Sequence, residues 1–211
     1  MLKTKEVTVM NLQNAMRGAR NPHNSWDRSD SYWLGGNDII SGLDYILGPN
    51  DIALAKRLRN AGSDHRKFMR QIFVSMDIIA PLYWWKEFDT YKVGTCANSS
   101  STMHRLHKEA LTREDISCEN MLPSSLKILD DLINEINLLR VQFNETKDKK
   151  YWYSMIQLLP SSYNQLRTVT MTYENLVNMY HARKNHKLDE WHQFIETIEK
   201  LPYFNELIKG E

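Results

Sequence analysis

The segment 68–79 constrains the fold of this chain more than any other. Its apolar residues alternate with smaller or polar ones, at Ile72, Val74, Met76 and Ile78. A period of two places successive side chains on opposite faces of a strand, so this segment predicts a strand with one buried face. Ala80-Pro81 closes the strand, and Pro81 suits the first turn of a following helix. The chain therefore needs a sheet as well as helices.

Helices account for most of the remaining sequence. Apolar residues at helical spacing, among them Leu129, Ile133 and Ile136, predict a long helix over 123–145. Shorter helices are expected over 11–20 with Asn11 as its cap, and over 52–61, 82–88, 148–159, 173–183 and 188–201. Residues 6–10 and 167–172 are expected to be extended, and residues 93–101 to form a loop.

These elements predict an α/β chain of the α+β type. We expect a small, mostly antiparallel sheet with several helices, helix-rich overall, in a single domain over residues 1–211. The segment near 29–48 is rich in Asn, Ser, Asp and Gly, and it is expected to form a loop and a hairpin insert.

Charge and composition narrow the class of protein. Lys and Arg number 27 and Asp and Glu number 26, so the formal net charge of the 211 residues is +1. A binder of nucleic acid or of an anionic membrane would carry a large basic excess, so we expect neither partner. No apolar run approaches the about 20 residues that span a bilayer. The first residues lack an apolar signal stretch, and two cysteines imply no disulfide framework, so we expect a cytoplasmic protein.

Familiar catalytic and metal-binding patterns do not occur in the sequence. His104 and His107 could share a helix face, but no third ligand lies near them, and Cys96 and Cys118 are isolated. Metal sites need three or four ligands, so we expect no metal. The G-x-S-x-G, H-E-x-x-H and phosphate-loop glycine patterns are absent as well.

Two polar segments flank an aromatic block, Tyr83-Trp84-Trp85. We interpret the block as core, although a stacking surface for a planar ring is an alternative. Gly62-Ser-Asp-His65-Arg-Lys67 lies upstream, and a glycine-containing segment with Lys92, several hydroxyls and an amide lies downstream, over 89–102. Several hydrogen-bond donors close together suit a phosphate group. An ordinary solvated turn is the alternative interpretation.

Four separated motifs occur in a recognisable order. They are Ala15-Met-Arg17-Gly-Ala19-Arg20 followed by Ser25; Gly62-Ser-Asp-His65 before the alternating strand and Ala80-Pro81; Thr90-Tyr91-Lys92 followed by Ser100; and Leu159-Pro160, Tyr163, Asn178 and Ala182-Arg183. Together they resemble the motifs of the flavin-dependent thymidylate synthase family, whose signature R-H-R-x7-S falls on 90–92 and Ser100. The resemblance covers most of the chain except the segments near 29–48 and 124–150.

This resemblance implies a fold like that of the thymidylate synthase-complementing proteins, usually assembled as a homotetramer with FAD at subunit interfaces. Members of the family methylate dUMP to dTMP with methylenetetrahydrofolate as carbon donor, and reduced flavin, recharged by NADPH, supplies the hydride. That chemistry needs no protein nucleophile. The protein positions two planar rings and holds their phosphates, so binding geometry supplies most of the catalysis.

The resemblance also implies roles for individual residues. His65 would lie beside the flavin ring, Ser25 near the flavin-nucleotide phosphates, and Ser100 at the dUMP phosphate, while Arg183 would contact the pyrimidine or its phosphate. The full expected sets are Ser25, His65, Arg66, Lys67, Tyr91 and Lys92 for the cofactor, and Glu87, Ser100 and Arg183 for the substrate.

The sequence departs from the family pattern at its signature. Thr90, Tyr91 and Lys92 replace the arginine, histidine and arginine, and Glu87 stands where a glutamine is usual. Each lost arginine contact is worth ~1.5–3 kcal/mol, so losing two without replacement weakens a phosphate ligand by about two to four decades. Lysine supplies a point charge in place of a bidentate fork. Arg66, Lys67 and other nearby cations could compensate, or they could be solvated surface charges.

Three functions are therefore open. The first is a divergent flavin-dependent thymidylate synthase that acts on dUMP or on a related pyrimidine nucleotide. The second is a nucleotide-binding relative that keeps the fold without methyl transfer. The third is a helical interaction protein whose helix over 123–145 docks a partner.

Overall fold

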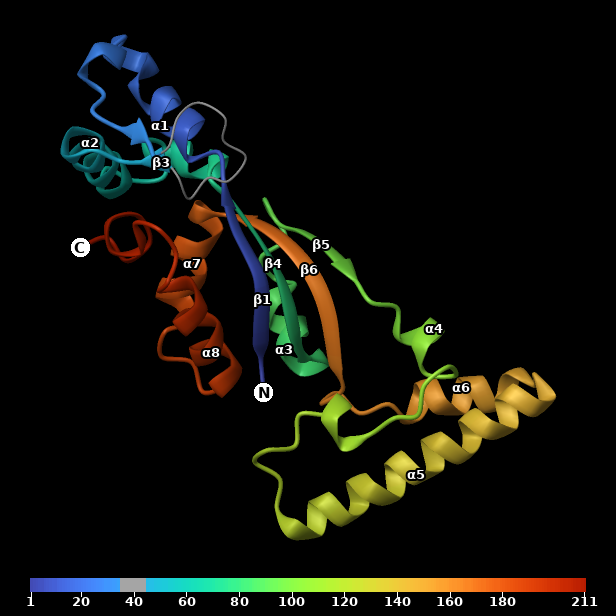
Figure 1. The fold of residues 1–211 in the computed structure, drawn as a ribbon. Helices are drawn as coiled ribbons and strands as arrows, with labels where there is room; N and C mark the ends of the chain where they lie inside the picture. The colour runs from blue at the N-terminus through green and yellow to red at the C-terminus, as the bar shows by residue number, and fades with distance from the viewer. Residues whose placement is uncertain (35–44) are drawn as a thin grey trace. The chain divides into compact units, whose positions relative to one another are not determined.

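The computed structural model describes residues 1–34 and 45–211. Its main sheet has four strands in the order β1-β4-β6-β5 (Figure 1), and a two-stranded sheet pairs β2 with β3. The strands are β1 Lys3–Met10, β2 Tyr32–Trp33, β3 Tyr45–Ile46, β4 Phe73–Pro81, β5 Cys96–Ser99 and β6 Asn164–Thr172. The α-helices are α1 Leu12–Arg20, α2 Pro49–Asn60, α3 Leu82–Phe88, α4 Thr102–Arg105, α5 Pro123–Thr146, α6 Lys149–Leu158, α7 Tyr173–Arg183 and α8 Asp189–Ile198.

Strand β4 has the one-sided burial that its alternation predicts. Val74, Met76 and Ile78 are buried, whereas Ser75 and Asp77 on the other face are partly exposed. Thr168 donates to Asp77 at 2.6 Å and Thr170 donates to Ser75 at 3.3 Å, which fixes an antiparallel register between β4 and β6. The strand begins later than expected because Arg66–Gln71 forms the 3₁₀ helix η3.

The chain divides into two compact units. The first contains residues 1–3, 79–90 and 98–167, and the second contains residues 4–78, 91–97 and 168–211. The division falls inside the long strands, so β4 and β6 contribute residues to both units. The expectation of a single domain over 1–211 stays a prediction.

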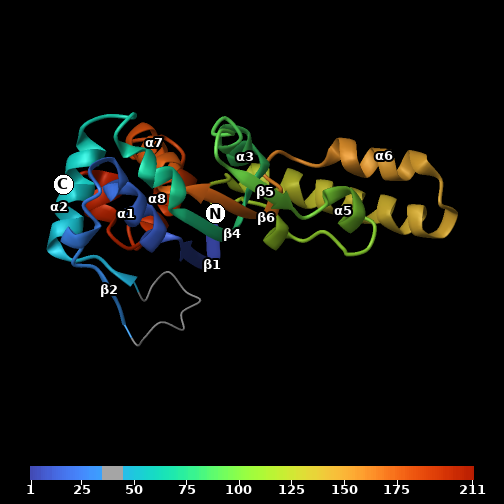
Figure 2. The same cartoon turned by 90° about the horizontal axis from the view of Figure 1, so that it is seen from above.

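The core of the first unit lies between α5 and α6, which run side by side (Figure 2). Leu129, Ile133, Ile136 and Leu139 of α5 are buried there with Met155 of α6. This confirms the long amphipathic helix that the spacing predicts. The face of α5 that carries these residues packs within the first unit.

The core of the second unit surrounds α7. This helix packs against η3 and against a C-terminal π-helical turn, Phe204–Lys209, and α1 packs against η3 as well. Tyr173, Leu176 and Met179 of α7 are fully buried, as are Trp191 and Phe194 of α8. The second unit thus holds α1, η3 and α7 in one packed arrangement.

Some local predictions are wrong. Residues 96–99, expected as loop, form the edge strand β5, whose side chains are all exposed. Asn11 occupies the N-cap position of α1, as expected, but its side chain makes no capping hydrogen bond; it adopts a left-handed conformation with φ of 69°, and its amide donates to the carbonyl oxygen of Gln71 at 2.9 Å. A tertiary contact therefore takes the place of the usual side-chain capping bond.

The expected insert near 29–48 is described only at its two ends. There, β2 and β3 pair antiparallel, with Tyr32 opposite Ile46 and Trp33 opposite Tyr45. Residues 35–44 lie outside the described part of the chain, so the hairpin itself stays a prediction. Across residues 1–34 and 45–211, no helix has the length and apolar character to cross a bilayer.

Candidate functional site

Arg183, at the end of α7, is held by two aromatic rings. Its Nε donates to the Tyr91 hydroxyl at 3.0 Å, and its guanidinium lies 5.6 Å from the centre of the Tyr91 ring and 4.9 Å from that of Trp191. The Trp191 ring is fully buried. Stacking on aromatic faces and a hydrogen bond donated by Nε fix the plane of a guanidinium. Two of the predicted site residues, Tyr91 and Arg183, are thus brought together.

The loop that carries Tyr91 is tied to the start of α7. Asn175 donates its amide to the carbonyl oxygen of Val93 at 2.6 Å, and the Thr95 hydroxyl donates to the carbonyl oxygen of Tyr91 at 2.7 Å. Gly94 has φ of 79°, a left-handed conformation that favours glycine. Lys92 lies in this loop with an exposed side chain, so its charge faces solvent.

The first turn of α7 is shaped by a capping box. The Thr172 hydroxyl accepts from the backbone N–H of Asn175 at 3.2 Å, and the Asn175 amide oxygen accepts from the backbone N–H of Thr172 at 3.0 Å. This reciprocal pair satisfies two backbone donors and starts the helix directly after β6. Asn175 therefore holds both the helix start and the Tyr91 loop.

Glu174, next along α7, pairs with two arginines of η3. Arg66 Nε lies 3.2 Å from its Oε1, and Arg70 donates to both carboxylate oxygens. Burial raises the pKa of Glu174, but hydrogen bonds from Arg70 and Arg66 outweigh it and hold the pKa below its ordinary value. Two guanidiniums share one carboxylate, so one positive charge remains on this surface. Arg66 also lies 3.4 Å from the amide oxygen of Asn178.

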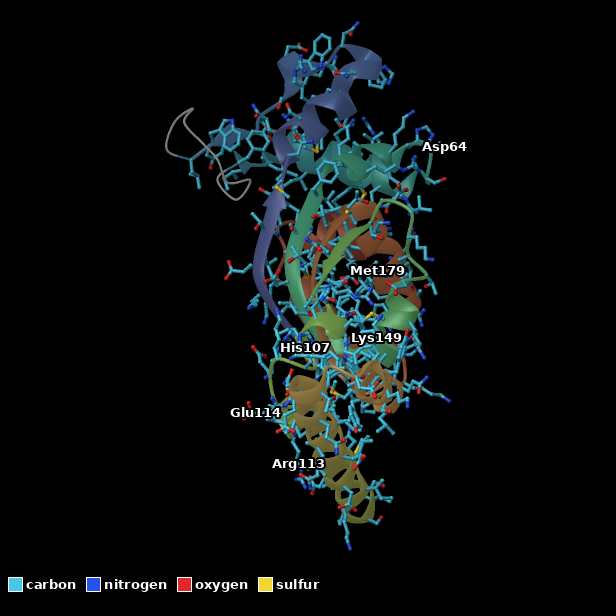
Figure 3. All side chains as sticks on the ribbon, turned by 90° about the vertical axis from the view of Figure 1, so that its right-hand side faces the viewer. Asp64, His107, Arg113, Glu114, Lys149 and Met179 are labelled. Atoms are coloured by element: carbon cyan, nitrogen blue, oxygen red, sulfur yellow. The ribbon has the colours of Figure 1, made fainter. Side chains whose placement is uncertain are left out.

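His65 and Lys67 lie in a hollow of about 470 Å³ between α1, the end of α2 and η3. Gly18, Ala19, Leu58 and Phe68 give this hollow an apolar wall, and Asp64 is its acidic member. Figure 3 labels Asp64, whose side chain points outward from the turn before η3. Gly62, with φ of 104°, makes that turn, and its carbonyl oxygen accepts from the N–H groups of His65 and Arg66 at 3.1 and 3.0 Å.

Ser25 lies in a different hollow from His65. Its hollow also borders α1 and α2, but its lining includes Arg28 and Arg57 instead of His65 and Lys67. The Ser25 carbonyl oxygen accepts from the buried Arg20 at 3.1 Å. Ser25 and His65, which the resemblance assigns to different parts of the flavin nucleotide, thus line two hollows that share Ala19.

Glu87 and Ser100 belong to the first unit. The Thr90 hydroxyl donates to the carbonyl oxygen of Glu87 at 2.7 Å, so Thr90, at a signature position, closes the end of α3. The backbone N–H of Ser100 donates to the carbonyl oxygen of Leu166 at 2.9 Å, and Gln165 donates to the Ser100 carbonyl oxygen at 3.0 Å. Ser100 is therefore fixed beside the start of β6.

Sequence reasoning missed Glu174 and Trp191. Glu174 is four residues before Asn178 on the same helix face, so the i, i+4 spacing on α7 could have indicated a polar surface there. Trp191 carries no comparable signal, because a buried aromatic in an amphipathic helix is ordinary core. Within the described residues, no three His, Cys, Asp or Glu side chains gather closely enough to hold a metal ion.

Comparison with known proteins places the fold. No family model matches the sequence, and no curated protein matches it. The thymidylate synthase ThyX of Helicobacter pylori, solved with FAD and dUMP, is 18% identical, with a TM-score of 0.68 over 97% of this chain and 98% of that one. A second structure of that flavin-dependent enzyme, also with FAD and dUMP, is 17% identical, with a TM-score of 0.66 and the same coverage. This likeness confirms the expected fold class.

Proposed function

We propose that this chain is a divergent flavin-dependent thymidylate synthase that methylates dUMP or a related pyrimidine nucleotide. Methylenetetrahydrofolate would donate the carbon and NADPH the reducing equivalents. The observation that carries the proposal is the stacked, hydrogen-bonded Arg183, at a position where the family resemblance expects a nucleotide contact. The shared fold with an enzyme solved with FAD and dUMP supports it.

Arg183 would bind and orient the nucleotide. A guanidinium that is already stacked loses little side-chain freedom on binding, so more of each hydrogen bond appears as affinity. Tyr91, which replaces the signature histidine, serves here as a support for Arg183. Lys92 would keep one exposed positive charge near the ligand. The loop thus retains a positioning function although both of its arginines are absent.

The residues around His65 fit a flavin nucleotide chemically. An apolar wall suits a planar ring, and Lys67 in the lining suits a diphosphate. Arg66 and Arg70, which share Glu174, lie on the same η3 helix outside the lining and add one positive charge. A volume of about 470 Å³ is ordinary for a small-molecule site. FAD, when bound and reduced, supplies the hydride. The chain's own part is to hold the cofactor and the nucleotide in register, and we extend the proposal to a homotetramer in the cytoplasm.

A second candidate function is nucleotide binding without methyl transfer. It is favoured by Glu174, which neutralises one of the two arginines that would otherwise face an anionic cofactor. The third function considered from the sequence is docking of a partner on the helix 123–145. The regular apolar face of α5 does not favour it, because that face is buried in the first unit; Ile128, Leu138 and Val141 of the same helix are exposed.

The decisive assay is the formation of dTMP from dUMP with FAD, NADPH and methylenetetrahydrofolate supplied. We expect turnover that depends on FAD, on NADPH and on methylenetetrahydrofolate. Binding of dUMP without any product, at saturating FAD, would assign the chain to the non-catalytic alternative. No binding of either nucleotide would reject both functions.

A further inference from the structure

The hollow that contains Ser25 has several cations in its lining and, among the residues that the structure describes, no carboxylate. It has a volume of about 710 Å³, and its lining residues are Ala19, Arg20, His23, Ser25, Arg28, Asn50, Ala53, Leu54 and Arg57. Arg28, Arg57 and His23 are exposed, and within residues 1–34 and 45–211 none of their side chains pairs with a carboxylate. Cations on protein surfaces are commonly offset by nearby acids, so such a group in one hollow attracts anions.

A buried ion pair fixes the floor of this hollow. Arg20 and Asp51 are 5% and 0% exposed, and Arg20 Nε donates to Asp51 at 2.6 Å. The same guanidinium donates to the carbonyl oxygens of Ser25 and Arg28 at 3.1 Å each, and the Ser29 hydroxyl donates to Asp51 at 2.6 Å. The turn that carries Arg28 is thereby tied to α2, which carries Arg57.

Two aspartates described on the same elements, Asp51 and Asp30, are engaged in other contacts. Asp51 is paired with Arg20, and Asp30 accepts from the backbone N–H groups of Asn50 and Asp51 at 2.8 and 3.1 Å, at the start of α2. These backbone hydrogen bonds, Asn50 first, outweigh the small effect of burial and lower the pKa of Asp30, so it is ionised and turned toward the helix. Asp27 is exposed and is not part of the lining.

We propose that this hollow binds the phosphate group of a small phosphorylated metabolite. Arg28 and Arg57 supply the charge, His23, Ser25 and Asn50 supply hydrogen bonds, and Ala53 and Leu54 give the organic part of the ligand an apolar surface. The volume suits a molecule the size of a nucleotide. The ligand we propose is a mononucleotide separate from FAD, so the inference does not rest on the proposed function.

Calorimetric titration tests the site with three probes: inorganic phosphate, AMP and FAD, each at low ionic strength. The test variant is the double substitution Arg28→Gln and Arg57→Gln. Its control, Arg17→Gln with Lys5→Gln, removes the same charge from exposed positions outside the hollow. Thermal unfolding shows that both variants fold, which is expected because all four side chains are exposed.

The expected result is that AMP binds, that inorganic phosphate competes with it, and that the double variant loses affinity about 100-fold or more while the control does not. If FAD binds to the double variant unchanged, the ligand is a separate nucleotide, as proposed; if FAD affinity falls in parallel, the hollow is part of the cofactor site that the family resemblance expects at Ser25, and the proposal is overturned. AMP binding by a chain that binds no FAD would leave this site intact and reject the proposed function. The proposal is overturned if the double variant binds every probe as the wild type does, or if the wild type binds none of them.

Discussion

At the scale of single residues, Arg183 stands at a motif position in the sequence, and in the structure it contacts Tyr91 and Trp191. Substitution by lysine keeps the charge but removes the planar group that stacks on Trp191 and donates to Tyr91. We expect Arg183→Lys to weaken dUMP binding about 10- to 100-fold, the range for one charge-assisted contact. Equilibrium titration with dUMP measures it. Lys108→Ala, which removes an exposed charge, is the control; an equal loss in both variants would place the nucleotide elsewhere.

Asp51 is a fully buried charged residue of the second unit, and its loss should lower the stability of the protein. Asp51→Asn removes the carboxylate from a fully buried pair and leaves Arg20 without its counter-charge. Breaking such a pair destabilises a protein by about 3–5 kcal/mol. Urea unfolding should show this decrease in the free energy of unfolding. The exposed Asp27→Asn should change it by less than about 0.5 kcal/mol, and similar values for both variants would contradict the role of the buried pair.

Single residues also show what a sequence can and cannot reveal about a site. Arg183 and Tyr91 were predicted because they stand at motif positions, and the structure joins them. The partnership of Glu174 with Arg66 and Arg70 was not predicted, because those residues are about a hundred positions apart in the chain and no local pattern links them. Ser25 and His65 stand in successive motifs, and they line two hollows that share Ala19, which no spacing in the sequence indicates. Motif spacing indicates which residues along the chain belong to a site, but it does not give the distances between them in the fold.

At the scale of elements, substitutions in α5 test whether its predicted apolar face stabilises the first unit. Ile136 is 1% exposed and Ile128 is 70% exposed on the same helix. Ile136→Ala should lower the free energy of unfolding by about 2–5 kcal/mol through lost burial and a cavity. Ile128→Ala should change it by less than about 0.5 kcal/mol. Chemical denaturation of the two variants measures the difference, and equal values would mean that α5 does not pack as described.

The C-terminal π-helical turn gives a prediction about pH. Arg59 of α2 donates to the carbonyl oxygens of Leu207, Ile208 and Lys209 at 3.3, 2.9 and 3.1 Å, and it lies 2.9 Å from His181 Nε2. Burial, then the charges of Arg59 and Lys184, lower the pKa of His181 from its ordinary 6.5. Neutral His181 accepts from Arg59, whereas protonated His181 repels it.

Because the unfolded chain binds this proton more readily, stability rises with pH in that range. The contribution of His181 is fully present above its ordinary pKa of 6.5 and is lost as pH falls through the lowered value. The melting temperature should therefore fall between about pH 7.5 and pH 5, and it should fall less in His181→Gln. Melting curves across this range measure the effect; identical pH profiles for wild type and variant would contradict the arrangement.

Elements with a regular apolar period were predictable, and those that depend on distant partners were not. The alternation in β4 and the helical spacing in α5 each describe one buried face, and both elements form. Strand β5 has four exposed side chains, so no period marks it; its position at the edge of the sheet comes from pairing with β6. The turn Phe204–Lys209 depends on Arg59, about 150 positions earlier, and no local signal announces it.

At the scale of the whole molecule, the family resemblance in the sequence predicted the fold class, and similar solved structures confirm that class at 17–18% identity. The signature R-H-R-x7-S, which would identify the activity, is the part of the family pattern that this sequence does not match. A fold can be kept while its ligand contacts are exchanged, because buried periodicity and site chemistry reside in different residues. The function must therefore be tested by measuring the binding of FAD and dUMP directly.

The most direct test is a titration of the purified chain with FAD, followed by its absorbance between roughly 350 and 500 nm, where the flavin ring reports its surroundings. The account predicts a saturable change in the flavin spectrum and a further change when dUMP is added. A spectrum that stays identical to free FAD at tens of micromolar protein, in a folded sample, would contradict it.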